Sequence, residues 1–243
     1  MEFRAQFFLS IFGYLLWAGV SLLFLEAIFG NVSEVRGWTR PQMWVLYGTF
    51  VVLESLVWGL LGPNMWRFSS MVRDGELDLV LIKPVNAQFF VSTRYIDLNA
   101  VLNVVPGIVL MIYGLRVLGV TPTLGQCAIW LLLLSCALLM AYCFWFFIVT
   151  WAIWIVRFDG VAILIDPMVR MAQFPIQIYP GRLQTFLVSV LPVAFFSTFP
   201  TQSLLGTLDW RMIPLGLFIA GALLLFNRLF FNFALRFYGS ASS

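Results

Sequence analysis

The sequence is poor in polar chemistry, and the residue types it lacks narrow the possible functions. Its 243 residues include no histidine, and Lys83 is the single lysine. The chain also shows no cluster of carboxylates and no nucleophile beside a base, so we do not expect an enzyme. A phosphate-binding loop needs Gly-Lys-Ser/Thr, but Lys83 follows Ile82. Any ATP hydrolysis is therefore expected from another polypeptide.

Cysteine is also scarce. Cys127, Cys136 and Cys143 all lie in one apolar segment. Along a single helix they are too far apart for a disulfide, which needs about 5.5–6 Å between Cα atoms. Without histidine, a metal site is not expected either. The three cysteines are predicted to be small apolar residues that fill space in a buried helix.

What the chain does contain is apolar. Hydrophobic residues make up 62% of it and charged residues only 10%. Soluble domains have about 45–50% apolar and about 25% charged residues. We therefore predict an all-α integral membrane protein that lies in the lipid bilayer. The net charge of +3 comes from scattered basic residues, so no nucleic-acid partner is expected.

A span of the bilayer needs about 20 mainly apolar residues. Six spans are predicted, at residues 7–29, 43–61, 99–120, 127–156, 160–179 and 212–233. The first is too long for a signal-peptide core and is expected to be retained. Pro106-Gly107 predicts a kink in the third span, and the long fourth span has no internal turn signal.

The region before the last span has a different pattern. Residues 183–206 are apolar but are split by Pro192 and Pro200. Each half is too short to cross, so we predict a re-entrant helical hairpin whose loose backbone groups are covered by protein. All 243 residues are expected to form one membrane domain.

Six spans place both termini on the same side of the membrane. Basic residues are more frequent in the segments on the side of the termini than on the opposite side. They are most concentrated in the connection between the second and third spans. The positive-inside rule therefore predicts cytoplasmic termini.

Residues 67–90, called the elbow below, carry charges between two apolar spans. Asp74-Gly75 interrupts the chain there, and a short helix is predicted to begin at Glu76 and to end before Pro84. On this helix Leu77, Val80 and Leu81 would form one apolar face.

In this helix Asp78 and Lys83 lie away from that face. Such a helix is suited to docking in a groove of a soluble partner. The alternative is an interfacial helix that lies on lipid headgroups.

Several ionisable residues lie inside predicted spans, where each costs at least about 2.5–3.5 kcal/mol. Glu54 is expected to need an arginine or a proton, and packing and a polar pathway are both open for it. Asp166 and Arg170, four residues apart, can pair on one helix. Asp166 before Pro167 also resembles a helix N-cap, and the alternative for Asp166 and Arg170 is contact with a substrate in the pathway. Glu26 is expected near the outer end of the first span.

Aromatic residues offer two further interpretations. Phe195, Phe196 and Phe199 in the hairpin are predicted to be either an outer gate or core packing. Tryptophans near the span ends are typical of an interface belt.

Residues 73–94, "RDGELDLVLIKPVNAQFFVSTR", resemble the cytoplasmic signature of the type-2 ABC exporter permeases, the ABC-2 family. The segments "GW…MWVLYG", "FPIQIYP", "LPVAFFSTFPTQSLLG" and "FYGSASS" extend the resemblance through almost the whole chain.

The resemblance implies a permease subunit that forms a dimer in the bacterial cell membrane, with a copy of itself or a related chain. It also implies a separate ABC ATPase that binds ATP and Mg, while this chain binds no cofactor. The elbow would then be a coupling helix that transmits the motion of the ATPase. The residues expected to take part are Arg73, Asp74, Gly75, Glu76, Leu77, Asp78, Val80, Leu81, Lys83 and Pro84.

A stand-alone secondary transporter or channel is the alternative. Such a protein would need charged or broken-helix sites near the membrane midplane, and Asp166-Pro167 is the only hint of one. The sequence does not identify the substrate.

Overall fold

A computed structural model describes residues 32–155 and 162–239, and the isolated positions 13, 16, 19, 20, 23, 26, 27, 29 and 30. The side chains of residues 162–164 are not described. The predicted first span, residues 7–29, therefore lies largely outside the described residues.

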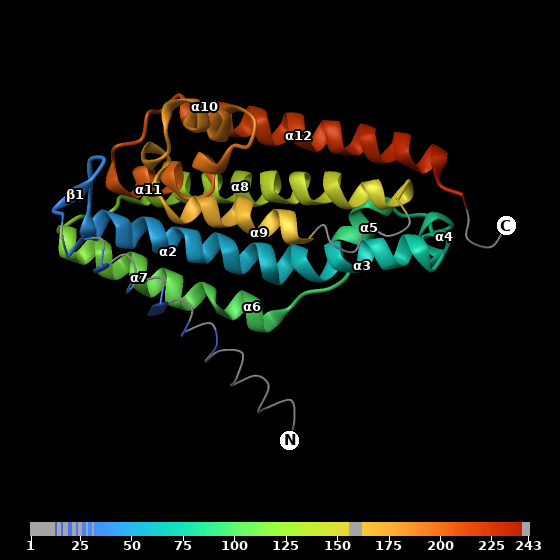
Figure 1. Cartoon of the computed structure of the whole chain (residues 1–243), viewed down its shortest axis with the longest axis horizontal. Helices are drawn as coiled ribbons and strands as arrows, with labels where there is room; N and C mark the ends of the chain where they lie inside the picture. Colours follow the sequence, from blue (N-terminus) through green and yellow to red (C-terminus); the bar gives the residue numbers. More distant parts are fainter. Residues whose placement is uncertain are drawn as a thin grey trace, which may run out of the picture.

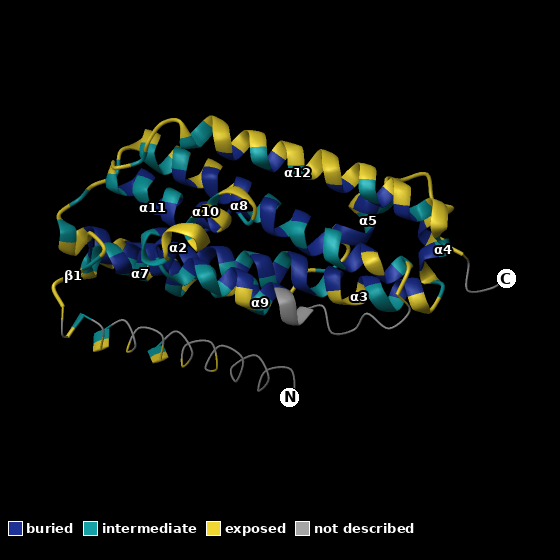
Figure 2. Cartoon of the chain, turned by 45° about the horizontal axis from the view of Figure 1, so that its top comes forward, coloured by how far each residue is buried: buried dark blue, intermediate teal, exposed yellow. Residues whose placement is uncertain are grey.

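Long helices lie side by side in an elongated bundle (Figure 1). They are α2 (Arg40–Leu56), α3 (Gly62–Arg73), α7 (Val104–Leu118), α8 (Leu124–Thr150) and α12 (Met212–Ala234). A short antiparallel pair, β1 (Glu34–Val35) and β2 (Trp38–Thr39), precedes α2. The buried residues lie mainly on α2 and α8, whereas α12 is exposed over much of its surface (Figure 2).

Within the described residues, four helices are long and apolar enough to cross a membrane: Arg40–Arg73, Leu98–Leu118, Leu124–Ile153 and Met212–Phe237. A bent pair before the last helix raises this number to five if it counts as one span. These helices correspond to the second, third, fourth and sixth predicted spans.

The predicted fifth span, residues 160–179, does not form a continuous crossing. It contains α9 (Ala162–Arg170) and two short 3-10 turns, Met171–Gln173 and Ile176–Ile178. Phe174 is extended, because a residue before proline is sterically disfavoured in the helical region. Pro175 thus ends the helical segment that the hydropathy suggested would continue.

The second span is longer than predicted, because the helix continues past Leu61 to Arg73. A π-helical turn, η1 (Val57–Leu61), joins α2 to α3. Pro63 has no N–H, so it cannot donate the usual helical hydrogen bond to the carbonyl of Gly59, four residues earlier. That carbonyl instead accepts a hydrogen bond from the Asp97 N–H at 2.8 Å. The proline is accommodated by this outside donor, so it does not end the helix.

The third span begins with α6 (Leu98–Leu102) and is interrupted at Asn103, before α7. The break lies one turn before the predicted position at Pro106-Gly107. Pro106 cannot donate to the carbonyl of Leu102, so the helical pattern fails on its N-terminal side. Gly107 packs directly against the backbone of Gly48 in α2.

Helix α8 is a single helix of 27 residues, as the absence of a turn signal predicted. Thr123 and Gln126 form a capping box at its start. Cys136 and Cys143 are buried and Cys127 is half-buried, in agreement with their predicted filling role.

The predicted hairpin corresponds to α10 (Gly181–Ser189), the 3-10 turn η5 (Val193–Phe195) and α11 (Thr198–Leu205). The segments before and after the break are bent by 74°, which fits either a broken span or a re-entrant loop. They lie at the β1 end of the bundle, far from the end that carries α4 (Glu76–Leu81) and the end of α12 (Figure 1).

Candidate functional site

The elbow forms a compact turn of short helices at one end of the bundle (Figure 1). Helix α4 begins at Glu76, as predicted, and α5 (Ala87–Thr93) follows it. Between α3 and α4, Gly75 has a left-handed backbone with φ of 74°. Glycine adopts this conformation without the steric cost of a Cβ atom, which allows the chain to reverse here.

The predicted apolar face of α4 packs largely inward and is not left open for a partner. Leu77 and Val80 are buried in the chain's own core, where α4 packs against α3 and α5. The side chains that point outward are Leu79, 61% exposed, and Ile82, 79% exposed. Leu81 is also exposed. Helix α4 thus has apolar residues on two faces, and periodicity alone could not tell which face would be covered.

The polar residues of the elbow lie mostly at its surface. Arg73, Asp74, Glu76, Lys83 and Pro84 are all exposed. The Arg73 Nε atom lies 3.3 Å from the Asp74 carboxylate, and the Lys83 ammonium lies 4.5 Å from the centre of the Phe90 ring.

The C-terminal segment contacts this end of the molecule at Tyr238. Burial raises the pKa of Tyr238, and the nearby carboxylate of Asp78 on α4 raises it further. The end of α12 is therefore in electrostatic contact with the elbow.

Asn64 holds the returning chain against α3, a role that sequence reasoning missed. Its side chain is buried; Nδ2 donates to the Tyr95 carbonyl at 2.7 Å, and Oδ1 accepts from the Tyr95 N–H at 2.9 Å. Arg67 adds a cation–π contact, with its guanidinium 3.9 Å from the Tyr95 ring centre. The only signal in the sequence is an asparagine within the apolar run "LLGPNMW".

Three ionisable side chains meet between α2 and α9. The Arg170 Nε atom lies 2.6 Å from the Asp166 carboxylate, which confirms the predicted pair. Arg170 also lies 3.9 Å from the Glu54 carboxylate and is the arginine that Glu54 was expected to need. The predicted N-cap is wrong, because Asp166 and Pro167 both lie inside α9.

Glu26, expected near an outer interface, pairs with Arg40 and accepts a hydrogen bond from the Trp44 indole at 2.9 Å. It thus has a structural partner at the start of α2.

The hairpin phenylalanines lie in the interior. Phe195 and Phe196 are buried, and the ring centres of Phe195 and Phe199 are 4.8 Å apart. Phe195 also packs over Gly216 of α12, where an added Cβ would lie 2.7 Å from its ring. This burial favours core packing over the outer gate.

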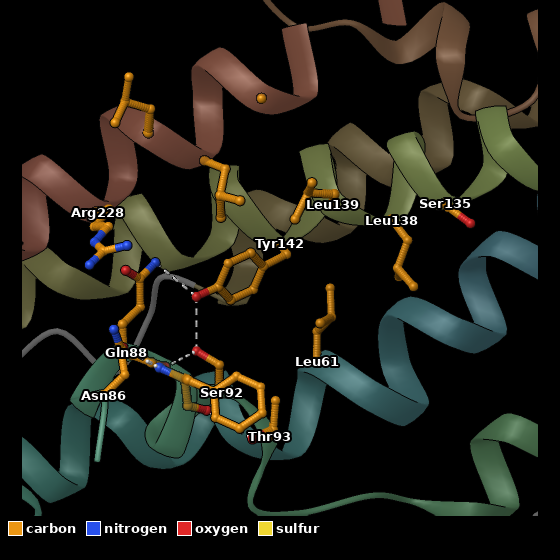
Figure 3. A pocket seen from close by; sticks show the side chains of 14 residues that line it. Leu61, Asn86, Gln88, Ser92, Thr93, Ser135, Leu138, Leu139, Tyr142 and Arg228 are labelled. Atoms are coloured by element: carbon orange, nitrogen blue, oxygen red, sulfur yellow. Dashed lines mark hydrogen bonds between the residues drawn. The ribbon is translucent and has the colours of Figure 1, made fainter. Parts of the chain in front are cut away.

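A cavity of about 770 Å³ lies between α5, α8 and α12, close to the elbow (Figure 3). Its polar side chains include Gln88, Ser92, Tyr142 and Arg228. The remaining wall is largely leucine. Gln88 donates to the Tyr142 hydroxyl at 3.0 Å, and Ser92 lies 3.0 Å from the same oxygen.

The geometry described above is that of a multi-helix membrane protein with an ordered polar turn at one end. Residues 15–242 match the model of a family described as ABC-2 family transporter protein. Comparisons with curated proteins and with solved structures found no match. Because the matched region covers nearly the whole chain, this protein belongs to the ABC-2 transporter family.

Proposed function

We propose that this chain is the membrane-spanning permease subunit of an ATP-driven exporter in the cell membrane. It forms the translocation path as a dimer, and a separate ABC ATPase supplies ATP and Mg and drives the transport cycle. Membership of the ABC-2 family supports the permease role.

The continuous helix from Arg40 to Arg73 is the observation that carries this proposal. Its 34 residues span about 50 Å at a rise of 1.5 Å per residue. The hydrocarbon core of a bilayer is about 30 Å thick. Part of this helix therefore extends beyond the bilayer core, and we assign that part to the end of α3 and the elbow, where a soluble subunit could reach it.

The elbow is also firmly connected to the spans on both sides. Leu77 and Val80 anchor α4 in the core, and Asn64 holds the connection to the third span at Tyr95. Leu79, Leu81 and Ile82 remain exposed for a partner. A force applied to α4 would reach two membrane helices at once, which is the property that a coupling helix needs.

The charges support a cytoplasmic elbow. Arg67, Arg73, Lys83 and Arg94 lie in or beside it. By the positive-inside rule these charges favour a cytoplasmic location for this end, which includes the end of α12.

Co-purification with the ABC ATPase co-encoded with this chain tests the proposal. In the double variant Leu79→Asp/Ile82→Asp, we expect the amount of co-purified ATPase to fall at least about tenfold. Two carboxylates would then have to be buried in a contact that the wild type makes with apolar side chains. Leu124→Asp, at an 89% exposed position at the other end of α8 from the elbow, is the matched control and should bind normally. Equal ATPase retention by the double variant and the wild type would contradict the coupling role.

A stand-alone secondary transporter is the second candidate, favoured by the group of Glu54, Asp166 and Arg170. The Glu54 and Asp166 carboxylates share the Arg170 guanidinium, so the group has one negative charge in excess when both are ionised. Binding of a proton to one carboxylate would neutralise this charge. Proton flux in proteoliposomes of the chain alone, lost in Glu54→Gln, would favour this alternative over the exporter.

A further inference from the structure

We propose that the cavity between α5, α8 and α12 binds an anionic lipid of the surrounding bilayer, with the lipid headgroup at Arg228. This inference goes beyond the proposed function. It concerns a ligand of the membrane-embedded part and does not depend on binding of an ATPase.

Arg228 is the first step in the argument. It is the only charged residue of α12, from Met212 to Ala234. It lies nine residues, or about 14 Å, before the end of this span at Phe237. Within the part of the chain that the structure describes, no acidic side chain forms an ion pair with Arg228. Its side chain is exposed and lies beside Asn86 and Gln88 of the elbow, which is the level at which a lipid headgroup would meet the protein.

Two amide side chains lie beside this guanidinium, Asn86 and Gln88, and the Gln88 nitrogen donates to Tyr142. Figure 3 shows Arg228, Gln88 and Asn86 together at one end of the cavity. The same three residues line a second cavity of about 230 Å³. The Asn86 oxygen caps α5 by accepting from the Phe89 N–H at 3.0 Å, which leaves its NH₂ group available to a ligand. One charge and adjacent amide donors suit a phosphate oxygen.

The other end of the cavity is mainly apolar, and the Ser135 hydroxyl there donates to the Leu131 carbonyl of its own helix at 2.8 Å. Leu138 and Leu139 of α8 and Leu224 and Leu225 of α12 all line it. The wall extends over seven residues of each helix, or about 10 Å: from Tyr142 to Ser135 on α8 and from Arg228 to Gly221 on α12. This elongated apolar wall beside a cationic end fits an acyl chain below an anionic headgroup.

The lining chemistry also separates this ligand from its competitors. None of the residues that line the cavity is acidic, and Arg228 is the only charged one. A cationic amphiphile would therefore be repelled by Arg228 and would find no carboxylate to pair with. A second copy of the chain that bound through this same cavity face would bring its own Arg228 and no acidic side chain to neutralise the first one. The volume of about 770 Å³ lies within the range of about 300–1,000 Å³ that is usual for ligand pockets.

Binding of a fluorescent phosphatidylglycerol to the purified full-length chain in neutral detergent tests the proposal. We expect phosphatidylglycerol to bind more tightly than phosphatidylcholine with the same acyl chains. Arg228→Gln should weaken phosphatidylglycerol binding about tenfold and weaken phosphatidylcholine binding much less, because its choline already neutralises the phosphate. Arg236→Gln, an exposed arginine that follows α12 and lines neither cavity, should bind like the wild type.

A second variant tests the apolar end without changing charge. Gly221 lines the cavity, and a Cβ added there meets no atom within 4 Å. Gly221→Phe should therefore fold normally, fill the space and weaken binding of both lipids. Glycerol phosphate, which has the headgroup charge but no acyl chain, should not compete.

Three results would overturn the inference. The first is wild-type phosphatidylglycerol affinity in Arg228→Gln, and the second is full competition by glycerol phosphate. The third is an efficient disulfide between two copies that carry Leu225→Cys, which would mean that a second chain covers the cavity.

Discussion

Asn64 illustrates how one buried polar side chain can position a connection between two membrane helices. It lies one residue after Pro63, where the helix has lost a backbone donor, and it bonds both backbone groups of Tyr95. Its Nδ2 also donates to the carbonyl of Leu60 at 2.9 Å. The Leu60 carbonyl of the π-helical turn is thus satisfied by Asn64, and the Gly59 carbonyl is satisfied by Asp97 of the chain that leaves the elbow.

We expect Asn64→Ala to lower the free energy of unfolding by about 1–3 kcal/mol, because it leaves the Tyr95 N–H and carbonyl without their partner. Unfolding titrations in mixed micelles measure this change. The control is Asn99→Ala, whose side chain makes no hydrogen bond within the described residues. Similar losses in both variants would show that Asn64 has no special role.

Glu54 and Arg170 show a related effect inside the membrane. Each would be costly alone, but α2 and α9 bring them together with Asp166. The sequence indicated that Glu54 needed a partner, and only the packing of the two helices identified it.

At the scale of elements, the close packing of α2 on α7 organises the bundle. The backbones meet at Gly48 and Gly107: a Cβ on Gly48 would lie 2.6 Å from the Gly107 carbonyl, and one on Gly107 would lie 2.8 Å from the Gly48 carbonyl. Small residues allow membrane helices to approach closely and gain van der Waals contact. Gly107, predicted as part of a kink, is instead a contact point.

Gly107→Ala should therefore destabilise the chain by about 1–3 kcal/mol, because the added methyl group must push two backbones apart. Gly221→Ala is the matched control, since its Cβ meets nothing within 4 Å and alanine favours a helix. The thermal unfolding midpoint in detergent compares the two. A midpoint for Gly107→Ala that equals the wild-type value would mean that the helices do not pack this closely.

At the scale of the whole molecule, the two ends of the bundle differ in character. One end carries the elbow and the end of α12, and the other carries β1, α10 and α11 (Figure 1). The long α2–α3 helix connects them, and under the proposed function it would carry a displacement of the elbow toward the opposite end.

Cysteine labelling in oriented membrane vesicles tests the orientation of the molecule. In a Cys127→Ser background, Ile82→Cys should react with an impermeant maleimide only from the cytoplasmic side, and Leu124→Cys only from outside. Both positions are highly exposed, while Cys136 and Cys143 are buried and should react slowly. Labelling of Ile82→Cys from outside would reverse the topology and contradict the ATPase contact.

Local patterns were most reliable where one signal dominated. The uninterrupted apolar run of α8 predicted a single helix, and Gly75 followed by Glu76 predicted the start of α4. Prolines were less reliable, because their effect depends on whether another segment satisfies the freed carbonyl. Pro63 lies within a continuing span, whereas Pro175 ends a helical segment.

The sequence by itself determined that this protein is a helical membrane protein, because its apolar content can be hidden only in lipid. Together with its motifs, it also indicated the family and the position of the elbow. The tertiary structure decided which face of α4 is exposed, which arginine serves Glu54, and that Arg228 meets Asn86 and Gln88 at a cavity. These outcomes depend on contacts between segments far apart in the chain, and the periodicity of one helix carries no information about what packs against it.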